Sequence, residues 1–215
     1  MQQSTIPNLV VFGCPGAGKG SLAAYLVDDF GFYQLSTGNA MRAWAQGDSP
    51  AQLELREGLA HGRYGSDELA VQIVEETIAG LPASTPAVIF DGFPRTPRQL
   101  EVWLAAGNTG RAVFLEVTEE VAIARIQERG TCPNDGTGYP GIGLPCQRCG
   151  ALTVQRSDDG AIETIKKRFA TYRATVEPVI AAWQAAGLPF ERFDGDISLD
   201  ELRIVAAVIA RDFEK

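Results

Sequence analysis

The chain has 215 residues, of which 45% are hydrophobic and 21% are charged, and its net charge at pH 7 is −8. This composition is ordinary for a globular protein, and the acidic balance disfavours nucleic-acid binding through bulk electrostatics. No apolar run approaches the roughly 18 residues of a membrane span, and the first eight residues do not have the pattern of a secretory signal, so we expect a cytosolic protein.

Short apolar segments that end at Gly or Asp alternate with helix-like stretches, which is typical of a parallel sheet covered by helices. Strands are predicted at residues 9–12, 33–35, 87–90, 112–117 and 190–193. Helices are predicted at 19–28, 67–79, 97–106, 119–128, from about 161 onwards, and at 199–213. We expect Pro178 to break or kink the helix that begins near residue 161, because proline has no amide to donate.

Two stretches interrupt this alternation. Residues 36–65 contain no predicted strand and are expected to form a small helical insertion, whereas residues 130–159 are rich in Gly, Pro and Cys and are expected to form a loop-built excursion. The sequence therefore predicts one domain over residues 1–215, with insertions at 36–65 and 128–159 and a core made of 1–35, 66–127 and 160–215.

A glycine-rich segment, residues 13–21 with the sequence GCPGAGKGS, follows the first predicted strand and opens the first predicted helix. Its glycines let the backbone curl so that amides point at an anion, and the helix N-terminus adds a favourable dipole. Lys19 would reach the outer phosphates of a nucleotide. The usual phosphate loop has Ser or Thr directly after the lysine, but here Gly20 intervenes and the hydroxyl comes at Ser21.

This spacing resembles the phosphate loop of the adenylate kinase family. Further segments resemble that family in its own order along the chain: residues 35–42, residues 91–96 with Gln99, residues 125–129, and a cysteine-rich stretch followed by residues 156–168. The resemblance spans essentially the whole chain. It implies an α/β fold, a P-loop parallel sheet flanked by helices, with a helical AMP-binding insertion and a lid insertion. It also implies reversible transfer of the terminal phosphoryl group of ATP, bound with Mg²⁺, to AMP, giving two ADP.

The resemblance implies roles for individual residues, in a reaction that needs alignment and charge stabilisation more than covalent chemistry. Arg42 and Arg95 would hold the AMP phosphate, Arg129 would serve the ATP side, and Arg156 and Arg168 would close over the phosphates. The catalytic set that follows is Lys19, Asp91, Arg95, Arg129, Arg156 and Arg168. The ATP site would comprise Gly16, Ala17, Gly18, Lys19, Gly20, Ser21, Arg125, Arg129, Gly138, Tyr139 and Ile197.

Asp91 ends a predicted strand, so we expect its carboxylate to hold Mg²⁺ through water rather than to cap the following helix. Thr37 matches a family threonine that contacts the AMP base, and together with the long lid it favours AMP over UMP or CMP. A related kinase for another nucleoside monophosphate, UMP or CMP, stays the alternative. The AMP site would comprise Thr37, Arg42, Arg63, Tyr64, Gly65, Gly92, Phe93, Pro94, Arg95, Gln99, Arg156 and Arg168.

The cysteine-rich stretch, Cys132-x₂-Asp135 followed after ten residues by Cys146-x₂-Cys149, resembles the zinc-bearing lid of some adenylate kinases. It implies a structural Zn²⁺ held by these four residues, since zinc accepts carboxylate oxygen as well as thiolate. Asp135 is alternatively a turn residue. A redox role for the two later cysteines is disfavoured, because that chemistry places them at a helix start. The expected partners are ATP, AMP and ADP, with no nucleic acid or membrane, and the chain is expected to be a monomer.

Overall fold

The computed structural model describes residues 6–60, 65–134, 136–155, 159 and 161–213. Five strands form its central sheet in the order β2-β3-β1-β4-β7, and all neighbouring pairs are parallel. Each strand overlaps its predicted range, so the predicted parallel α/β sheet is confirmed. The strands are β1 (Asn8–Phe12), β2 (Tyr33–Ser36), β3 (Val88–Asp91), β4 (Arg111–Glu116) and β7 (Phe190–Asp194).

Helices follow the strands, and several begin at residues whose hydroxyl accepts a hydrogen bond from a backbone amide of the first turn. Ser66, Thr96, Thr118 and Ser198 cap α4, α5, α6 and α8 in this way. The helices are α1 (Lys19–Phe30), α2 (Thr37–Trp44), α3 (Pro50–Ala60), α4 (Asp67–Ala79), α5 (Pro97–Ala105), α6 (Glu119–Glu128), α7 (Ile162–Ala185) and α8 (Leu199–Arg211).

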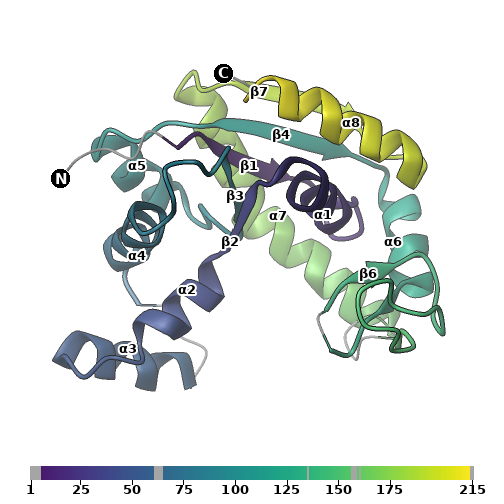
Figure 1. Cartoon of the computed structure of the whole chain (residues 1–215), viewed down its shortest axis with the longest axis horizontal. Helices are drawn as coiled ribbons and strands as arrows, with labels where there is room; N and C mark the ends of the chain where they lie inside the picture. Colours follow the sequence, from purple (N-terminus) through teal and green to yellow (C-terminus); the bar gives the residue numbers. More distant parts are fainter. Residues whose placement is uncertain (1–5, 61–64, 135, 156–158, 160, 214–215) are drawn as a thin grey trace.

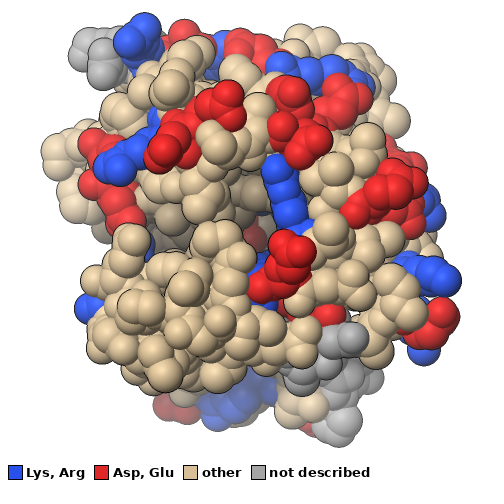
Figure 2. All heavy atoms as spheres, turned by 90° about the vertical axis from the view of Figure 1, so that its right-hand side faces the viewer, with Lys and Arg blue, Asp and Glu red and all other residues tan. Residues whose placement is uncertain are grey.

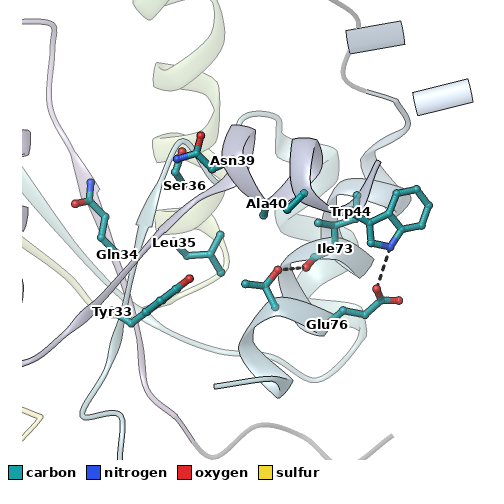
Figure 3. A pocket seen from close by; sticks show the side chains of 11 residues that line it. Tyr33, Gln34, Leu35, Ser36, Asn39, Ala40, Trp44, Ile73 and Glu76 are labelled. Atoms are coloured by element: carbon teal, nitrogen blue, oxygen red, sulfur yellow. Dashed lines mark hydrogen bonds between the residues drawn. The ribbon is translucent and has the colours of Figure 1, made fainter. Parts of the chain in front are cut away.

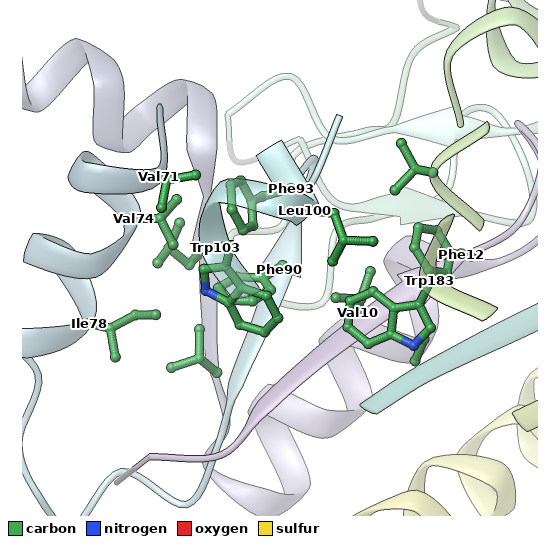
Figure 4. Close-up of a cluster of buried hydrophobic side chains, with 14 of the residues drawn as sticks. Val10, Phe12, Val71, Val74, Ile78, Phe90, Phe93, Leu100, Trp103 and Trp183 are labelled. Carbon is green, nitrogen blue, oxygen red and sulfur yellow. The ribbon is translucent and has the colours of Figure 1, made fainter. Parts of the chain in front are cut away.

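Both faces of the sheet are buried at its three central strands, β3, β1 and β4, as their mostly apolar sequences require. Successive strand residues point to opposite faces, so Val10 and Phe12 pack with Trp103 of α5 and Trp183 of α7, whereas Leu9 packs on the face covered by α1 and α8. Figure 4 shows the first of these clusters, in which the Trp103 and Trp183 rings stack with centroids 6.2 Å apart.

The sequence predicts a break or a kink at Pro178; the break was wrong, because α7 continues through Pro178 from Ile162 to Ala185, and the kink stays a prediction. Proline removes one backbone hydrogen bond from a helix, and Pro178 itself is exposed. The residues that follow it, Val179, Ile180 and Trp183, are buried in the core. Their burial stabilises the helical continuation more than the lost hydrogen bond destabilises it.

Two modules extend from the same side of the sheet, to the left and right of α7 in Figure 1. One consists of α2 and α3, whose residues Met41 and Leu55 form a small separate core with Ile73 of α4. The other lies between α6 and α7 and contains the antiparallel pair β5 (Gly130–Thr131) and β6 (Gly138–Tyr139). None of the described helices is long and apolar enough to cross a membrane.

Candidate active site

The phosphate-loop segment connects β1 to α1, as predicted, and it lies against α6. Gly16 adopts a φ of +85°, and a Cβ there would lie 2.4 Å from the carbonyl oxygen of Ala122. Gly18, with a φ of +93°, is the N-cap of α1. The glycines are therefore required by close approach and by left-handed backbone geometry, and the amides of the loop gather at a helix N-terminus suited to anions.

Lys19 lies at the centre of this loop. Its Nζ donates to the carbonyl oxygens of Gly13 at 2.7 Å and Cys14 at 2.8 Å. Burial lowers the pKa of Lys19 to about 8, the nearby Asp91 opposes that shift, and the Arg168 and Arg129 charges add to it. Lys19, Asp91, Arg129 and Arg168 thus lie close enough to interact electrostatically, and these are four of the six residues predicted to be catalytic.

Asp91 is the last residue of β3, at the edge of the sheet where β1 leads into the phosphate loop. The N-cap of the next helix is Thr96, so Asp91 does not cap it. The backbone carbonyl of Asp91 accepts a hydrogen bond from Thr37 Oγ1 at 3.3 Å, while its side chain is exposed. An exposed carboxylate beside Lys19 at the phosphate end of the sheet is a suitable oxygen ligand for Mg²⁺.

The segment from Gly92 to Gln99 forms a tight turn that fixes Arg95. Arg95 Nε donates to the Gly92 carbonyl at 2.8 Å, and the backbone amide of Arg95 donates to Gln99 Oε1 at 2.7 Å. The peptide bond between Phe93 and Pro94 is cis, and the Phe93 ring is buried against the core. The predicted Gly92, Phe93, Pro94, Arg95 and Gln99 therefore form one positioning unit.

The α2 helix carries the other predicted acceptor residues. Arg42 Nη2 donates to Asn39 Oδ1 at 2.5 Å and lies above Gly38. The Thr37 side chain is 2% exposed and donates to the Asp91 carbonyl, so its contact with a base stays a prediction. Gly65, with a φ of +73°, precedes α4. The predicted Arg63 and Tyr64 lie outside the described residues, as does Arg156.

A buried carboxylate joins the two arginines next to the phosphate loop. Asp159 is fully buried; its Oδ2 accepts from Arg129 Nε at 3.0 Å and Nη2 at 2.6 Å, and its Oδ1 accepts from Arg168 Nη1 at 2.5 Å. The sequence-based site prediction omitted Asp159. The available signal was an acidic residue inside a segment bounded by two predicted phosphate-binding arginines, Arg156 and Arg168.

Arg125 and Ile197 also come together, at the end of α6 and the turn after β7. Arg125 Nη1 donates to the Gly195 carbonyl at 2.6 Å, and Nη2 donates to the Ile197 carbonyl at 3.2 Å. The turn after β7 and the end of α6 are thereby joined. Gly138, a predicted ATP-site residue of the lid, lies beside the Arg129 side chain. A Cβ atom added to Gly138 would be 3.6 Å from Arg129 Cδ.

Three cysteine sulfur atoms of the lid lie within 4.8 Å of one another: those of Cys132, Cys146 and Cys149. The Sγ atoms of Cys132 and Cys149 are 3.5 Å apart. Two thiolates of a tetrahedral zinc site at Zn–S distances of about 2.3 Å are separated by about 3.8 Å. The sulfur positions therefore fit zinc. The predicted fourth ligand, Asp135, lies outside the described residues.

Two turns of the same form carry these cysteines. The amide of Gly136 donates to the Cys132 carbonyl at 3.0 Å, and the amide of Gly150 donates to the Cys146 carbonyl at 2.8 Å. Both glycines have positive φ, +76° and +74°. Turns of this kind direct amides and side chains of one segment toward a common centre, which is what a thiolate-bound ion needs.

Tyr139 contacts this cysteine cluster rather than open space. Its hydroxyl lies 3.3 Å from the Cys146 sulfur and accepts from the Gln147 amide at 2.8 Å. The hydrogen bond from Tyr139 lowers the pKa of Cys146 to about 7. A lowered thiol pKa favours the thiolate, the form that binds a metal. The structure thus ties Tyr139 to the predicted zinc site, and its predicted contact with the ATP adenosine stays a prediction.

The rest of the lid carries few charges, and its surface occupies the lower part of the face in Figure 2, where uncharged side chains predominate. Between residues 130 and 155 the only charged residues are Asp135 and Arg148. Arg148 Nη2 donates to both carboxylate oxygens of Asp28, at 2.9 Å each, and so connects the cysteine turn to the end of α1.

Comparison with known proteins identifies relatives over most of the chain. The family model described as adenylate kinase matches residues 11–188. An adenylate kinase of Rhizorhabdus wittichii is 35% identical over 213 residues, covering 94% of this chain and 98% of the relative. One from Novosphingobium aromaticivorans is 34% identical over 214 residues, covering 94% and 97%. One from Citrifermentans bemidjiense is 37% identical over 192 residues, covering 84% and 89%.

Proposed function

Because the chain belongs to the adenylate kinase family, we propose that it transfers the terminal phosphoryl group of ATP reversibly to AMP, giving two ADP. The observation that carries this proposal is the gathering of Lys19, Asp91, Arg129 and Arg168 beside the phosphate loop. The alternative, a kinase for UMP or CMP, is not favoured, since the relatives described above are all adenylate kinases.

On the donor side, the ATP phosphates would replace the loop carbonyls as partners of Lys19. The amides of residues 16–21 would surround the phosphates at the N-terminus of α1. Magnesium, held through water near Asp91, would neutralise negative charge on the outer phosphates. Arg125 and the turn that ends at Ile197 would border the adenine, and Gly138 would let the lid backbone approach the nucleotide.

On the acceptor side, Arg42 and Arg95 would bind the AMP phosphate from α2 and from the turn after β3, and Thr37 and Gln99 would line the base. Arg129 and Arg168 would face the transferred phosphoryl group, joined by Arg156 from the lid. Guanidinium groups suit this task because negative charge spreads over the three equatorial oxygens of the phosphoryl group in the transition state.

The proposal assigns residues 36–65 to the acceptor-binding insertion and 128–159 to the lid. Its support is the separate small core of α2 and α3, together with the placement of the lid between α6 and α7. Closure of both modules would exclude water, which otherwise competes with AMP as phosphoryl acceptor. In the same proposal the protein is a monomer in the cytosol that binds neither nucleic acid nor membrane, consistent with its net charge of −8.

We further assign a structural Zn²⁺ to Cys132, Asp135, Cys146 and Cys149. The sulfur spacing and the lowered pKa of Cys146 support the three thiolates. Asp135 holds the same sequence position in the first turn as Cys149 holds in the second, three residues after the leading cysteine. With four protein ligands the site would be closed, so the metal would stabilise the lid and take no part in the chemistry.

The test is ADP formation by the purified protein with ATP, Mg²⁺ and AMP. Lys19→Met and Arg95→Ala should each lower kcat by at least about 100-fold, because each removes a charge aimed at oxygens that become more negative in the transition state. Lys166→Met and Arg98→Ala are matched controls, since both side chains are exposed and form ion pairs away from the loop. Near-normal turnover in Lys19→Met, with folding intact, would overturn the proposal.

A further inference from the structure

An open cavity of about 460 Å³ is lined by residues of α2, the edge strand β2 and α4 (Figure 3). The α2 residues that line it are Asn39, Ala40, Ala43 and Trp44. None of the residues assigned to the acceptor site, such as Thr37 or Arg42, is among the described residues that line the cavity. The cavity therefore shares no described residue with the proposed acceptor site, but Asn39 connects the two, because its Oδ1 accepts a hydrogen bond from Arg42 Nη2.

All four residues of β2 line this cavity. β2 lies at the edge of the sheet and pairs only with β3 on its inner side among the described strands. The amide of Tyr33 donates inward to the Ala87 carbonyl at 2.9 Å. Because inward and outward groups alternate along a strand in a parallel ladder, the amide and carbonyl of Gln34 point to the open edge. A ligand here meets a donor and an acceptor side by side.

The lining of the cavity includes two aromatic side chains, Tyr33 and Trp44, and one carboxylate, Glu76. Tyr33 is 40% exposed and stands at one end, and the indole of Trp44 stands at the other (Figure 3). Among the described residues that line the cavity, Glu76 carries the only charge, and none is Lys, Arg or His. The Glu76 carboxylate accepts from Trp44 Nε1 at 3.0 Å and from Gln72 Nε2 at 2.8 Å. A carboxylate has about four acceptor positions, so capacity remains for a ligand.

We propose that this cavity binds a planar nitrogen heterocycle, neutral or cationic, that carries an amino group. The aromatic walls suit a flat ring, the edge of β2 offers a paired donor and acceptor, and Glu76 accepts from an amino group. A phosphorylated ligand is disfavoured because the lining provides no cation. Since Asn39 lines the cavity and accepts a hydrogen bond from Arg42 of the acceptor site, occupancy of the cavity alters AMP binding. This coupling rests on the proposed function, whereas binding itself does not.

The binding test uses 2-aminobenzimidazole as the probe and backbone amide NMR of the ¹⁵N-labelled full chain, with the active site filled by AMP and a non-hydrolysable ATP analogue. The expected result is saturable shifts confined to β2, α2 and the Glu76 turn of α4. Glu76→Gln should weaken binding about fivefold or more, because it removes the charge and keeps the shape. Glu75→Gln, the same change one residue away where Glu75 accepts from Asn108 outside the cavity lining, should bind the probe like the wild type.

A planar anion of similar size, 1-naphthoate, should bind at least about tenfold more weakly than the probe. Equal binding of the two compounds, equal binding by Glu76→Gln and wild type, or shifts located elsewhere would overturn the site. In steady-state assays, saturating probe should change the KM for AMP about threefold or more and leave the KM for ATP unchanged. Unchanged KM for both substrates would overturn the coupling. A chain without kinase activity would still show the NMR shifts, so failure of the proposed function is distinguishable.

Discussion

Substitution of Asp159 by Asn isolates what the buried carboxylate does for the two arginines. Asn has the same shape but no charge, and its amide nitrogen cannot accept from a guanidinium. One of the two arginines therefore loses its acceptor, and both lose a charge partner. Arg129 and Arg168 keep side-chain exposures of 26% and 27%, so water compensates in part.

The expected loss of folding stability is about 2–3 kcal/mol, below the roughly 3–5 kcal/mol of a fully buried pair that loses one partner. For a chain of this length such a loss lowers Tm by about 5–10 °C. The catalytic effect has a different origin. Arg129 engages Asp159 through Nε and Nη2, which fixes the guanidinium and leaves Nη1 as the group that would bind phosphate in the proposed site. Loss of that direction should lower kcat by about 100-fold, because the contacts form fully only in the transition state.

The assay is steady-state ADP formation well below the variant's Tm, with kcat and KM measured separately. The KM for ATP should change by less than about threefold, since Asp159→Asn adds a net positive charge that favours phosphate while it loosens the arginines. Asp29→Asn is the matched control: Asp29 binds Arg203 through both oxygens, at 2.7 and 2.6 Å, between α1 and α8 and away from the phosphate loop. A kcat for Asp159→Asn within about threefold of wild type, despite the lower Tm, would refute the positioning role and leave a structural one.

Four further predictions concern the loop, the metal and the acceptor. Lys19 has a pKa lowered to about 8, so the KM for ATP should rise as pH passes through 8 and Lys19 loses its proton; calorimetry in buffers of different ionisation enthalpy should show proton uptake on ATP binding near pH 8. Gly16→Ala should abolish activity and lower Tm, because its Cβ meets the Ala122 carbonyl; a normal Tm would contradict the steric argument. Cys146→Ser should lower zinc content, about one ion per chain by elemental analysis in the wild type, and should lower Tm while AMP binding persists. The kcat/KM for AMP should exceed that for UMP or CMP by about tenfold or more, as measured from initial rates over the same range of acceptor concentrations.

The sheet and its helices were predictable from the sequence because their signals are local. The central strands β1, β3 and β4 are short and mostly apolar, and the phosphate loop is recognisable from its glycines, because few other residues tolerate the φ of Gly16 or Gly18. The predicted helix break at Pro178 was wrong because it considered local chemistry alone. The burial of Val179 and Trp183, which favours the continued helix, is a tertiary effect that the local sequence does not display.

The site was predictable where one residue acts alone and less so where residues act through each other. Lys19 and Arg95 occupy motif positions, in the phosphate loop and in the turn after β3, and their catalytic roles stay predictions. Asp159 was missed because its role depends on Arg129, 30 positions away in sequence, meeting Arg168 at one carboxylate. Tyr139 was assigned to the nucleotide from its place in the lid, whereas its hydroxyl bonds to the cysteine turn, a contact across a hairpin that spacing does not encode.

The cations of the site share one feature that bears on how tightly the enzyme holds its substrates. Four of the cations that the structure describes are already bound to an acceptor of the protein itself: Lys19 to loop carbonyls, Arg95 to the Gly92 carbonyl, and Arg129 and Arg168 to Asp159. Substrate phosphates must exchange with these partners, so the gain in free energy on ground-state binding is smaller than the bare charges suggest. A reversible kinase benefits from this exchange. The cations then stabilise negative charge less in the ground state, with nucleotide bound, than in the transition state of phosphoryl transfer. This difference raises kcat, whereas equally strong ground-state binding would slow the release of ADP.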